Sequence, residues 1–339
     1  MSPPGTEALS IKSDGSVGAI AFSPDATRVG AGGGDSVIRV RAITTGPPLD
    51  VPADGFVSSI AFSPDGAAIA VADLDQLLVR NSTTGAVLWQ GAVEPQNSVN
   101  FVVFSPDGKR LVAATDTLVA IFDAATGAPG VRKVVDQTIV GFDLSTDGSR
   151  LAVAIDENHG GNHRRAGSAR VLDAMTGEEV SRHTPDDSVF AVAFSPDGSS
   201  VLYTSADGTT RMFTAATGKE LWQNEDDANH LAFDPTGKWT VTGGSDGEAR
   251  VLEAESGVEK TRGAPHDGAV THVAFSPNGK WAASTGIDNV LHVFNLEGND
   301  RYKSNTSEAL AMRFSADSHW LGLGTVDGVV VFDNGPEGA

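Results

Sequence analysis

The chain has 339 residues and no cysteine, which excludes disulfides, thiol nucleophiles and thiolate metal sites. Asp and Glu number 44 against 24 Lys and Arg, a formal charge of −20, so the surface repels nucleic-acid phosphates and anionic lipids, and we expect neither nucleic acid nor a membrane as a partner. No apolar run approaches about 18 residues, and the start "MSPPGTEALS" lacks the basic and apolar stretches of a secretory signal, which favours a soluble, cytoplasmic protein.

A short segment, "EALSIK" at residues 7–12, precedes a pattern that then recurs to the end of the chain. The pattern is marked by a corner of the type "AFSPDG", found at residues 61–66. An apolar residue ends a strand, Ser opens a turn, Pro presets the first central dihedral angle, and Gly supplies the positive φ that follows a type I hairpin turn. The apolar residue before the corner occurs eight times, at Phe22, Phe62, Phe104, Leu144, Phe194, Phe233, Phe275 and Phe314. The intervals are 40, 42, 40, 50, 39, 42 and 39 residues, so the chain is built from repeats.

Each unit also contains a second small turn, which ends in a glycine. These glycines are Gly46, Gly85, Gly127, Gly177, Gly218, Gly257, Gly298 and Gly335. The distance from the corner to this glycine is 33 residues in the fourth unit and 21 to 24 in the others. The fourth unit therefore carries an insertion, which we place at residues 156–167.

Each unit is predicted to form four strands, a to d, because short runs rich in Val, Ile, Leu, Phe and Ala alternate with polar corners. Strands a and b are nearly continuous apolar runs, as expected where both faces of a sheet are covered. Four-stranded sheets repeated at this period predict a β-propeller.

The two ends of the chain determine the number of blades. Eight sets of strands a to c run from about Val17 to Asp333, and nothing after Asn334 can supply an eighth strand d. We therefore predict that residues 7–12 complete the last blade, which removes a free sheet edge. The predicted fold class is all-β, a single eight-bladed β-propeller of four-stranded antiparallel blades that occupies residues 1–339.

The repeat resembles the WD40 type. The similarity lies in "VAFSPDG" after strand a, an Asp-bearing turn after strand b, and "VFDAATG" closing strand c. The Trp of that family near the end of strand c is replaced here by Arg41, Arg80, Phe122, Leu172, Phe213, Leu252, Phe294 and Phe332. The usual Gly-His before strand a is also missing. The resemblance implies a propeller fold and an interaction role, with the family's buried network of His, Ser, Asp and Trp incomplete in every blade.

The insertion in the fourth unit is the strongest departure from the repeat. In WD40-like propellers the b–c and d–a loops share one face, so "DENHGGNHRRAG" is a candidate binding loop there. Its candidate partner-binding residues are His159, His163, Arg164 and Arg165. The alternative is a tolerated surface insertion with no binding role. Two glycines separate the histidines and no third ligand is fixed, so we predict no metal site.

The turns expected on the same face carry many carboxylates. The d–a turns contain Asp14, Asp54, Asp136, Asp187, Asp227 and Asp267, and the b–c turns contain Asp35, Asp75, Asp116, Asp207, Asp246, Asp288 and Asp327. Together they would attract a basic partner, and we take Asp54 and Asp267 as candidate contact residues. The alternative is that each carboxylate caps its own turn.

The predicted function is a non-catalytic scaffold or sensor module that binds a protein or peptide with a basic surface and is a monomer when isolated. We predict no catalytic residue and no cofactor. The alternative is a quinoprotein-like or other propeller enzyme, because "AATGKELW" at residues 215–222 resembles the repeat of eight-bladed quinoprotein dehydrogenases. An enzyme predicts a deep pocket with converging titratable groups, whereas a scaffold predicts small and apolar lining residues.

Overall fold

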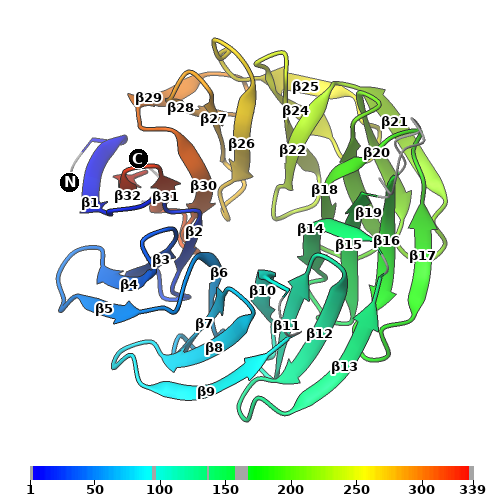
Figure 1. Cartoon of the computed structure of the whole chain (residues 1–339). Coiled ribbons are helices and arrows are strands. Elements are labelled where there is room, and N and C mark those ends of the chain that lie inside the picture. The colour runs from blue at the N-terminus through cyan, green and yellow to red at the C-terminus, as the bar shows by residue number, and fades with distance from the viewer. Residues whose placement is uncertain (1–2, 94–96, 136, 157–166, 336–339) are drawn as a thin grey trace. The chain divides into compact units, whose positions relative to one another are not determined.

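The computed structural model describes residues 3–93, 97–135, 137–156 and 167–335, and every regular element in those ranges is a β-strand (Figure 1). The strands form eight four-stranded sheets, in which strands a, b, c and d follow one another in antiparallel order. Among the described residues, no helix has the length and apolar character that a membrane span requires. We number the sheets as blades 1 to 8. The chain divides into two compact units, Met1–Thr115 with Val119–Gly130 and Ser304–Ala339, and Asp116–Leu118 with Val131–Lys303.

The first unit contains blades 8, 1, 2 and 3, which lie side by side through their a strands. Residues 131–134, at the end of the outer strand of blade 3, fall in the second unit. In the order a to d, the strands are β30 (Ala309–Phe314), β31 (Trp320–Thr325), β32 (Gly328–Asp333) and β1 (Thr6–Lys12) in blade 8; β2 (Ala19–Phe22), β3 (Arg28–Gly32), β4 (Val37–Ala42) and β5 (Leu49–Pro52) in blade 1; β6 (Val57–Phe62), β7 (Ala68–Asp73), β8 (Gln76–Asn81) and β9 (Val87–Ala92) in blade 2; and β10 (Val99–Phe104), β11 (Arg110–Thr115), β12 (Leu118–Asp123) and β13 (Pro129–Val134) in blade 3.

The second unit contains blades 4 to 7, which are also neighbours through their a strands. The strands are β14 (Thr138–Leu144), β15 (Arg150–Asp156), β16 (Gly167–Asp173) and β17 (Glu179–His183) in blade 4; β18 (Val189–Phe194), β19 (Ser200–Ser205), β20 (Thr209–Thr214) and β21 (Glu220–Glu225) in blade 5; β22 (Ala228–Phe233), β23 (Trp239–Gly244), β24 (Ala249–Glu253) and β25 (Glu259–Arg262) in blade 6; and β26 (Val270–Phe275), β27 (Trp281–Gly286), β28 (Val290–Asn295) and β29 (Asp300–Asn305) in blade 7.

The closing strand is the predicted one. Strand β1 pairs antiparallel with β32, from Thr6 opposite Asp333 to Lys12 opposite Gly328, so both chain ends lie at one sheet (Figure 1). On one face of β1, Leu9 and Ile11 pack against the apolar cluster that includes Val17 of blade 1. The prediction that residues 7–12 complete blade 8 is confirmed.

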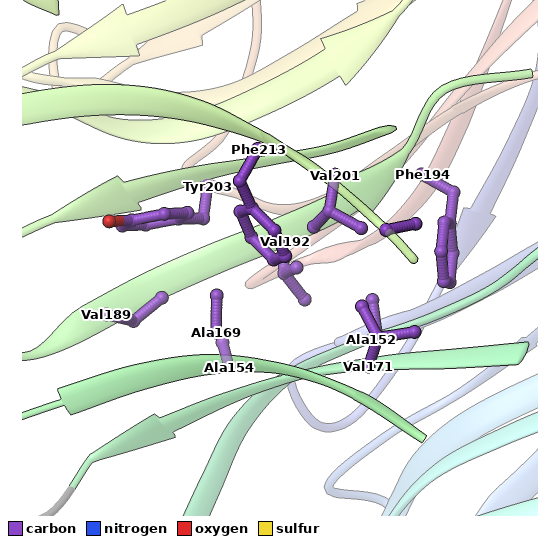
Figure 2. Close-up of a cluster of buried hydrophobic side chains, with 11 residues drawn as sticks. Ala152, Ala154, Ala169, Val171, Val189, Val192, Phe194, Val201, Tyr203 and Phe213 are labelled. Carbon is purple, nitrogen blue, oxygen red and sulfur yellow. The ribbon is translucent and has the colours of Figure 1, made fainter. Parts of the chain in front are cut away.

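The core lies between blades and is built mainly from strands a, b and c. Figure 2 shows one cluster in the second unit, where Ala152, Ala154, Ala169 and Val171 of blade 4 face Val192, Val201, Phe213 and further side chains of blade 5. Strand b is buried after its first residue in blades of both units, as its continuous apolar sequence predicts, except that Asp156 at the end of β15 is half-buried. The outer strand d is mostly exposed instead, with one buried residue in each of β9 and β21, namely Trp89 and Trp222.

The repeated corners owe their shape to a side-chain hydrogen-bond pattern. In seven blades the corner Ser donates its hydroxyl to the Asp or Asn two residues later, and in all seven it also accepts the N–H five residues later. Blade 6 uses Asp234 as the acceptor instead. The predicted glycines Gly66, Gly108 and Gly198 have φ of 71°, 69° and 70°. Ala26 and Ser318, which replace this glycine, also have positive φ, 56° and 62°, so these corners keep the turn and accept backbone strain.

The corner of blade 4 predicts a pH-dependent stability. The Asp147 carboxylate accepts Ser145 Oγ at 2.7 Å and the Ser149 N–H at 2.9 Å, and the hydrogen bond from Ser145 does most to lower the pKa of Asp147 to about 2. Since the folded-state pKa lies below the unfolded one, the stabilisation is present above about pH 4 and is lost as the pH falls toward 2. We expect Asp147→Asn to lower the urea midpoint at pH 7, with a difference from wild type that shrinks toward pH 2.

Blade 7 supplies the matched control for this measurement. Asn278 occupies the same position and accepts Ser276 Oγ at 2.7 Å and the Lys280 N–H at 3.0 Å without a titratable group. Asn278→Asp should therefore gain the pH dependence that Asp147→Asn loses. A midpoint difference that is independent of pH in both variants would contradict this account.

Candidate functional site

We call the end of a blade at which strand b turns into strand c its top end. In an antiparallel sheet this turn lies beside the connection that leads into strand a of the same blade. Backbone hydrogen bonds join the two segments, from Leu74 N to Phe56 O in blade 2 (3.4 Å) and from Ile287 N to Ala269 O in blade 7 (3.0 Å). The predicted contact residues Asp54 and Asp267 lie in these connections.

In blade 2 the connection is clamped by a buried carboxylate. Asp73, at the end of β7, is fully buried and accepts the N–H of Asp54 at 2.6 Å and the N–H of Gly55 at 2.8 Å. The Asp54 side chain is exposed, and its carboxylate has no hydrogen-bond partner among the described residues. The Leu74 side chain lies against Gly55, because a Cβ placed there would be 2.4 Å from Leu74 Cδ1. Asp54 is thus held beside an apolar side chain.

Blade 7 repeats this arrangement with different residues. The N–H of Asp267 donates to Asp288 Oδ2 at 3.1 Å, and the Asp267 side chain is exposed. A Cβ on Gly268 would lie 2.5 Å from Ile287 Cδ1, so Ile287 covers this glycine. Ile287 itself is 60% exposed. A fixed acidic loop again lies beside an exposed apolar side chain.

The top ends of three other blades have a different character. Asp35, Asp207 and Asp246 each cap their own turn through an N–H two residues later, which agrees with the capping alternative. Each also forms an ion pair with an arginine on strand c, namely Arg39, Arg211 and Arg250. Burial opposes ionisation of Asp207, but hydrogen bonds from Thr209 and Arg211 outweigh it and hold its pKa below the usual value. The predicted acidic face is therefore partly neutralised in blades 1, 5 and 6.

A Ser–His–Asp set occurs in blade 7. His266 lies 2.9 Å from Ser284 Oγ through Nε2 and 3.0 Å from Asp288 Oδ1 through Nδ1. These distances resemble those of a catalytic triad. However, the side chain of His266 and the whole of Ser284 are 0% exposed, so no substrate carbonyl can reach the hydroxyl. The set therefore acts as a structural link between the top-end connection, strand b and the b–c turn.

This link supplies His, Ser and Asp, three of the four members of the buried network that the sequence predicts to be incomplete. His266 precedes strand a in "PHDG" in place of the Gly-His pair, and Phe294 stands where the fourth member, Trp, is expected. The connection that leads into blade 6 carries a buried carboxyl group instead, which binds strand c of blade 5. The Thr210 hydroxyl donates to Asp226 at 2.5 Å, and burial raises the pKa of Asp226.

A cavity of about 340 Å³ in the second unit is lined by outer-strand and turn residues of blades 5 and 6. The lining residues are Gln223, Asn224, Glu225, Asp226, Arg250, Ser256, Gly257, Val258 and Glu259. Several of these polar groups bind each other or neighbouring residues. Arg250 pairs with Asp246 and lies 3.6 Å from Glu259, and Ser256 donates to Glu253 at 2.6 Å. Such a cavity can bind a polar group but presents no histidine beside a nucleophile.

The candidate residues of the insertion, His159, His163, Arg164 and Arg165, lie outside the described residues, as does Asp136. Strands β15 and β16 are paired up to Asp156 opposite Gly167, on either side of this segment. Within the described ranges no group of three His, Cys, Asp or Glu side chains could hold a metal ion.

Residues 90–123, 177–214, 219–252 and 260–295 match the family model described as WD domain, G-beta repeat. These four stretches are WD40 repeats. Each WD40 match begins in or just before the outer strand of one blade and ends on strand c of the next, so the repeat and the blade are offset by one strand. This offset explains why the outer strand of blade 8 comes from the start of the chain.

Comparison with known proteins agrees with this assignment. Over 127 residues the chain is 34% identical to an uncharacterized WD repeat-containing protein of Synechocystis sp., and the match covers 36% of this chain and 34% of that protein. Sqt1 of Chaetomium thermophilum, solved bound to the N-terminus of the ribosomal protein L10, has a TM-score of 0.79 at 21% identity over 94% of this chain and 97% of that chain. The C-terminal WD40 domain of Sif2 has a TM-score of 0.80 at 12% identity over 98% and 99% of the two chains. The fold is thus that of a WD40 β-propeller, with eight blades.

The WD40 pattern does not predict the exposed apolar residues at the top ends. Leu74, Ile287 and Val326 each follow strand b directly and are exposed. A single apolar residue at the end of an apolar run reads as part of the strand, which is why the sequence conceals them. The available signal is an apolar residue directly before the turn Asp, as in "LD", "ID" and "VD".

The clamp in blade 2 yields a paired prediction. Asp73→Asn leaves one buried acceptor oxygen for two N–H groups, so we expect a loss of about 1 to 3 kcal/mol in the free energy of unfolding. Amide exchange at residues 54 and 55 should accelerate with it. Asp54→Asn, at an exposed carboxylate, should change stability by less than about 0.5 kcal/mol. Equal losses in the two variants would show that the clamp is not formed as described.

Proposed function

We propose that the chain is a non-catalytic interaction module that binds a protein or peptide through the top ends of its blades. The observation that carries the proposal is the placing of exposed apolar side chains beside exposed carboxylates on clamped loops, as in Leu74 with Asp54 and Ile287 with Asp267. A pre-organised loop loses little conformational entropy on binding, so its contacts contribute more fully to affinity.

The partner surface should be basic. The chain has a formal charge of −20, and no arginine of the described ranges pairs with Asp54 or Asp267, in contrast to the turn carboxylates of blades 1, 5 and 6. Complementary charges mainly raise the association rate and are screened by salt. The structure of Sqt1 with the N-terminus of L10 provides a precedent for peptide recognition on this fold.

The burial of the Ser–His–Asp set favours this function over the alternative of a propeller enzyme. Its hydroxyl lies inside blade 7, and the cavity of blades 5 and 6 is lined by side chains that largely pair with each other or with adjacent residues. The single domain over residues 1–339, the monomeric state and the cytoplasmic location stay predictions.

Affinity capture with the purified chain, followed by kinetic measurement on the captured partner, tests the proposed function. The double variant Asp54→Asn, Asp267→Asn should slow association several-fold at low salt, with the effect fading as salt rises. Glu178→Gln with Glu255→Gln is the control, because it removes the same charge from exposed c–d turns at the opposite ends of the blades. Equal association rates for wild type and both double variants would exclude the top ends as the binding surface.

The insertion is tested by a shortened form. Strand pairing reaches Asp156 opposite Gly167, so residues 157–166 can be replaced by Asn-Gly, which suits a two-residue hairpin. Loop length costs little stability, so the thermal midpoint should change little. If the insertion binds the partner, the shortened form should capture fewer of the proteins that wild type captures. An unchanged set would remove His159, His163, Arg164 and Arg165 as contact residues.

A further inference from the structure

Leu74 adopts a backbone conformation that leucine normally avoids. The register of β7 and β8, with Asp73 opposite Gln76, makes Leu74 and Asp75 a two-residue hairpin turn. Leu74 has φ of 52°, in the left-handed region that favours Gly, Asn and Asp. In four other blades the left-handed residue of the b–c turn is the one after the turn Asp, namely Ser36, Gly208, Gly247 or Asn289. Leucine here costs stability that a glycine would not.

The strained leucine is displayed rather than buried. Leu74 is 44% exposed and Phe56 is 48% exposed. Leu74, in the b–c turn, lies against Gly55, and Phe56 follows Gly55 in the clamped connection. We call these two side chains the Leu74–Phe56 patch. Apolar surface left in water on a strained backbone is unfavourable twice over, for solvation and for conformation.

The patch is held rigidly from two sides. Asp73 binds the N–H groups of Asp54 and Gly55, and the carbonyl of Leu74 accepts the N–H of Val99 at 2.7 Å, at the start of strand a in blade 3. The loop therefore cannot relax to bury Leu74 without breaking these hydrogen bonds. An anchor fixed in this way is pre-organised for a partner.

The patch adjoins the carboxylate of Asp54, and strand c of this blade has no arginine at the position that carries one in blades 1, 5 and 6. In blades 1, 5 and 6 the residue of strand c that pairs with the fourth residue of strand b is an arginine. These residues are Arg39, Arg211 and Arg250. In blade 2 this position is Leu78, which is buried. Asp54 thus presents an exposed carboxylate two residues before Phe56 and next to Gly55, against which Leu74 lies.

We propose that the Leu74–Phe56 patch and Asp54 form the docking point for a partner segment that places an apolar side chain directly beside a lysine or arginine. This inference rests on the proposed function and narrows it to one blade and one partner chemistry. The apolar side chain packs on Leu74 and Phe56, and the cation pairs with Asp54. Burial of an anchor among such contacts concentrates the binding energy in few residues.

The test uses a displayed library of random-sequence peptides and the full chain. Wild type should enrich peptides in which an apolar residue adjoins Lys or Arg. For one enriched peptide, Leu74→Gly should raise Kd about tenfold or more, while its thermal midpoint equals or exceeds that of wild type. Leu74→Asn, which tolerates the left-handed conformation, should behave in the same way. Asp54→Asn should weaken binding at low salt and have less effect at high salt.

Leu88→Ala is the matched control, because Leu88 is equally exposed but lies on the outer strand of the same blade. It should leave Kd unchanged. If Leu74→Gly binds the enriched peptides as wild type does, this inference fails while the proposed function stands. If wild type enriches no peptide, this inference fails, whereas the proposed function fails only if affinity capture also finds no partner. A marked fall in the midpoint of Leu74→Gly and of Leu74→Asn would make Leu74 a structural residue and would also overturn the inference.

Discussion

Burial of strand b is the constraint on which the rest of this protein depends. In β11, β19 and β31 every residue after the first is buried. A polar side chain at such a position must find a partner or destabilise the blade. Close approach between blades also limits size, since a Cβ on Gly243 would lie 2.5 Å from Val270 Cγ1. The interior of each blade is therefore reserved for packing, and chemical diversity is confined to the ends of the strands and to the outer strand.

The two ends of the blades use this freedom differently. The corners between strands a and b repeat the same hydrogen bonds from a Ser, as Ser105 and Ser195 illustrate, and repetition of that kind serves the fold. The top ends differ from blade to blade. Some pair a turn carboxylate with arginine, as Asp207 does with Arg211, and others set an apolar residue beside an exposed acid. Only the variable end can distinguish one partner from another.

Blade 7 shows why geometry and accessibility must be considered together. Ser284, His266 and Asp288 have the spacing of a nucleophile, a base and an orienting acid. Complete burial converts the same hydrogen bonds into a brace that joins three segments of one blade. A buried network that is fully hydrogen-bonded stiffens its surroundings, and this stiffness fixes the loop that carries Asp267.

The sequence by itself determined the eight repeats, the four strands in each, the corners with a positive φ, and the use of residues 7–12 as the last strand. These features follow from local rules, because a turn such as "SPDG" and an apolar run such as "RLVAAT" carry their conformation in a few adjacent residues. The tertiary structure decided what the top-end carboxylates do. Whether an Asp is neutralised, buried or exposed depends on strand c and on the connection that leads into strand a of the same blade, about 4 to 22 residues away in the chain, as with Asp35 and Arg39 or Asp288 and His266. The exposure of Leu74 was equally hidden, because an apolar residue at the end of a buried strand is exposed only when the chain turns there.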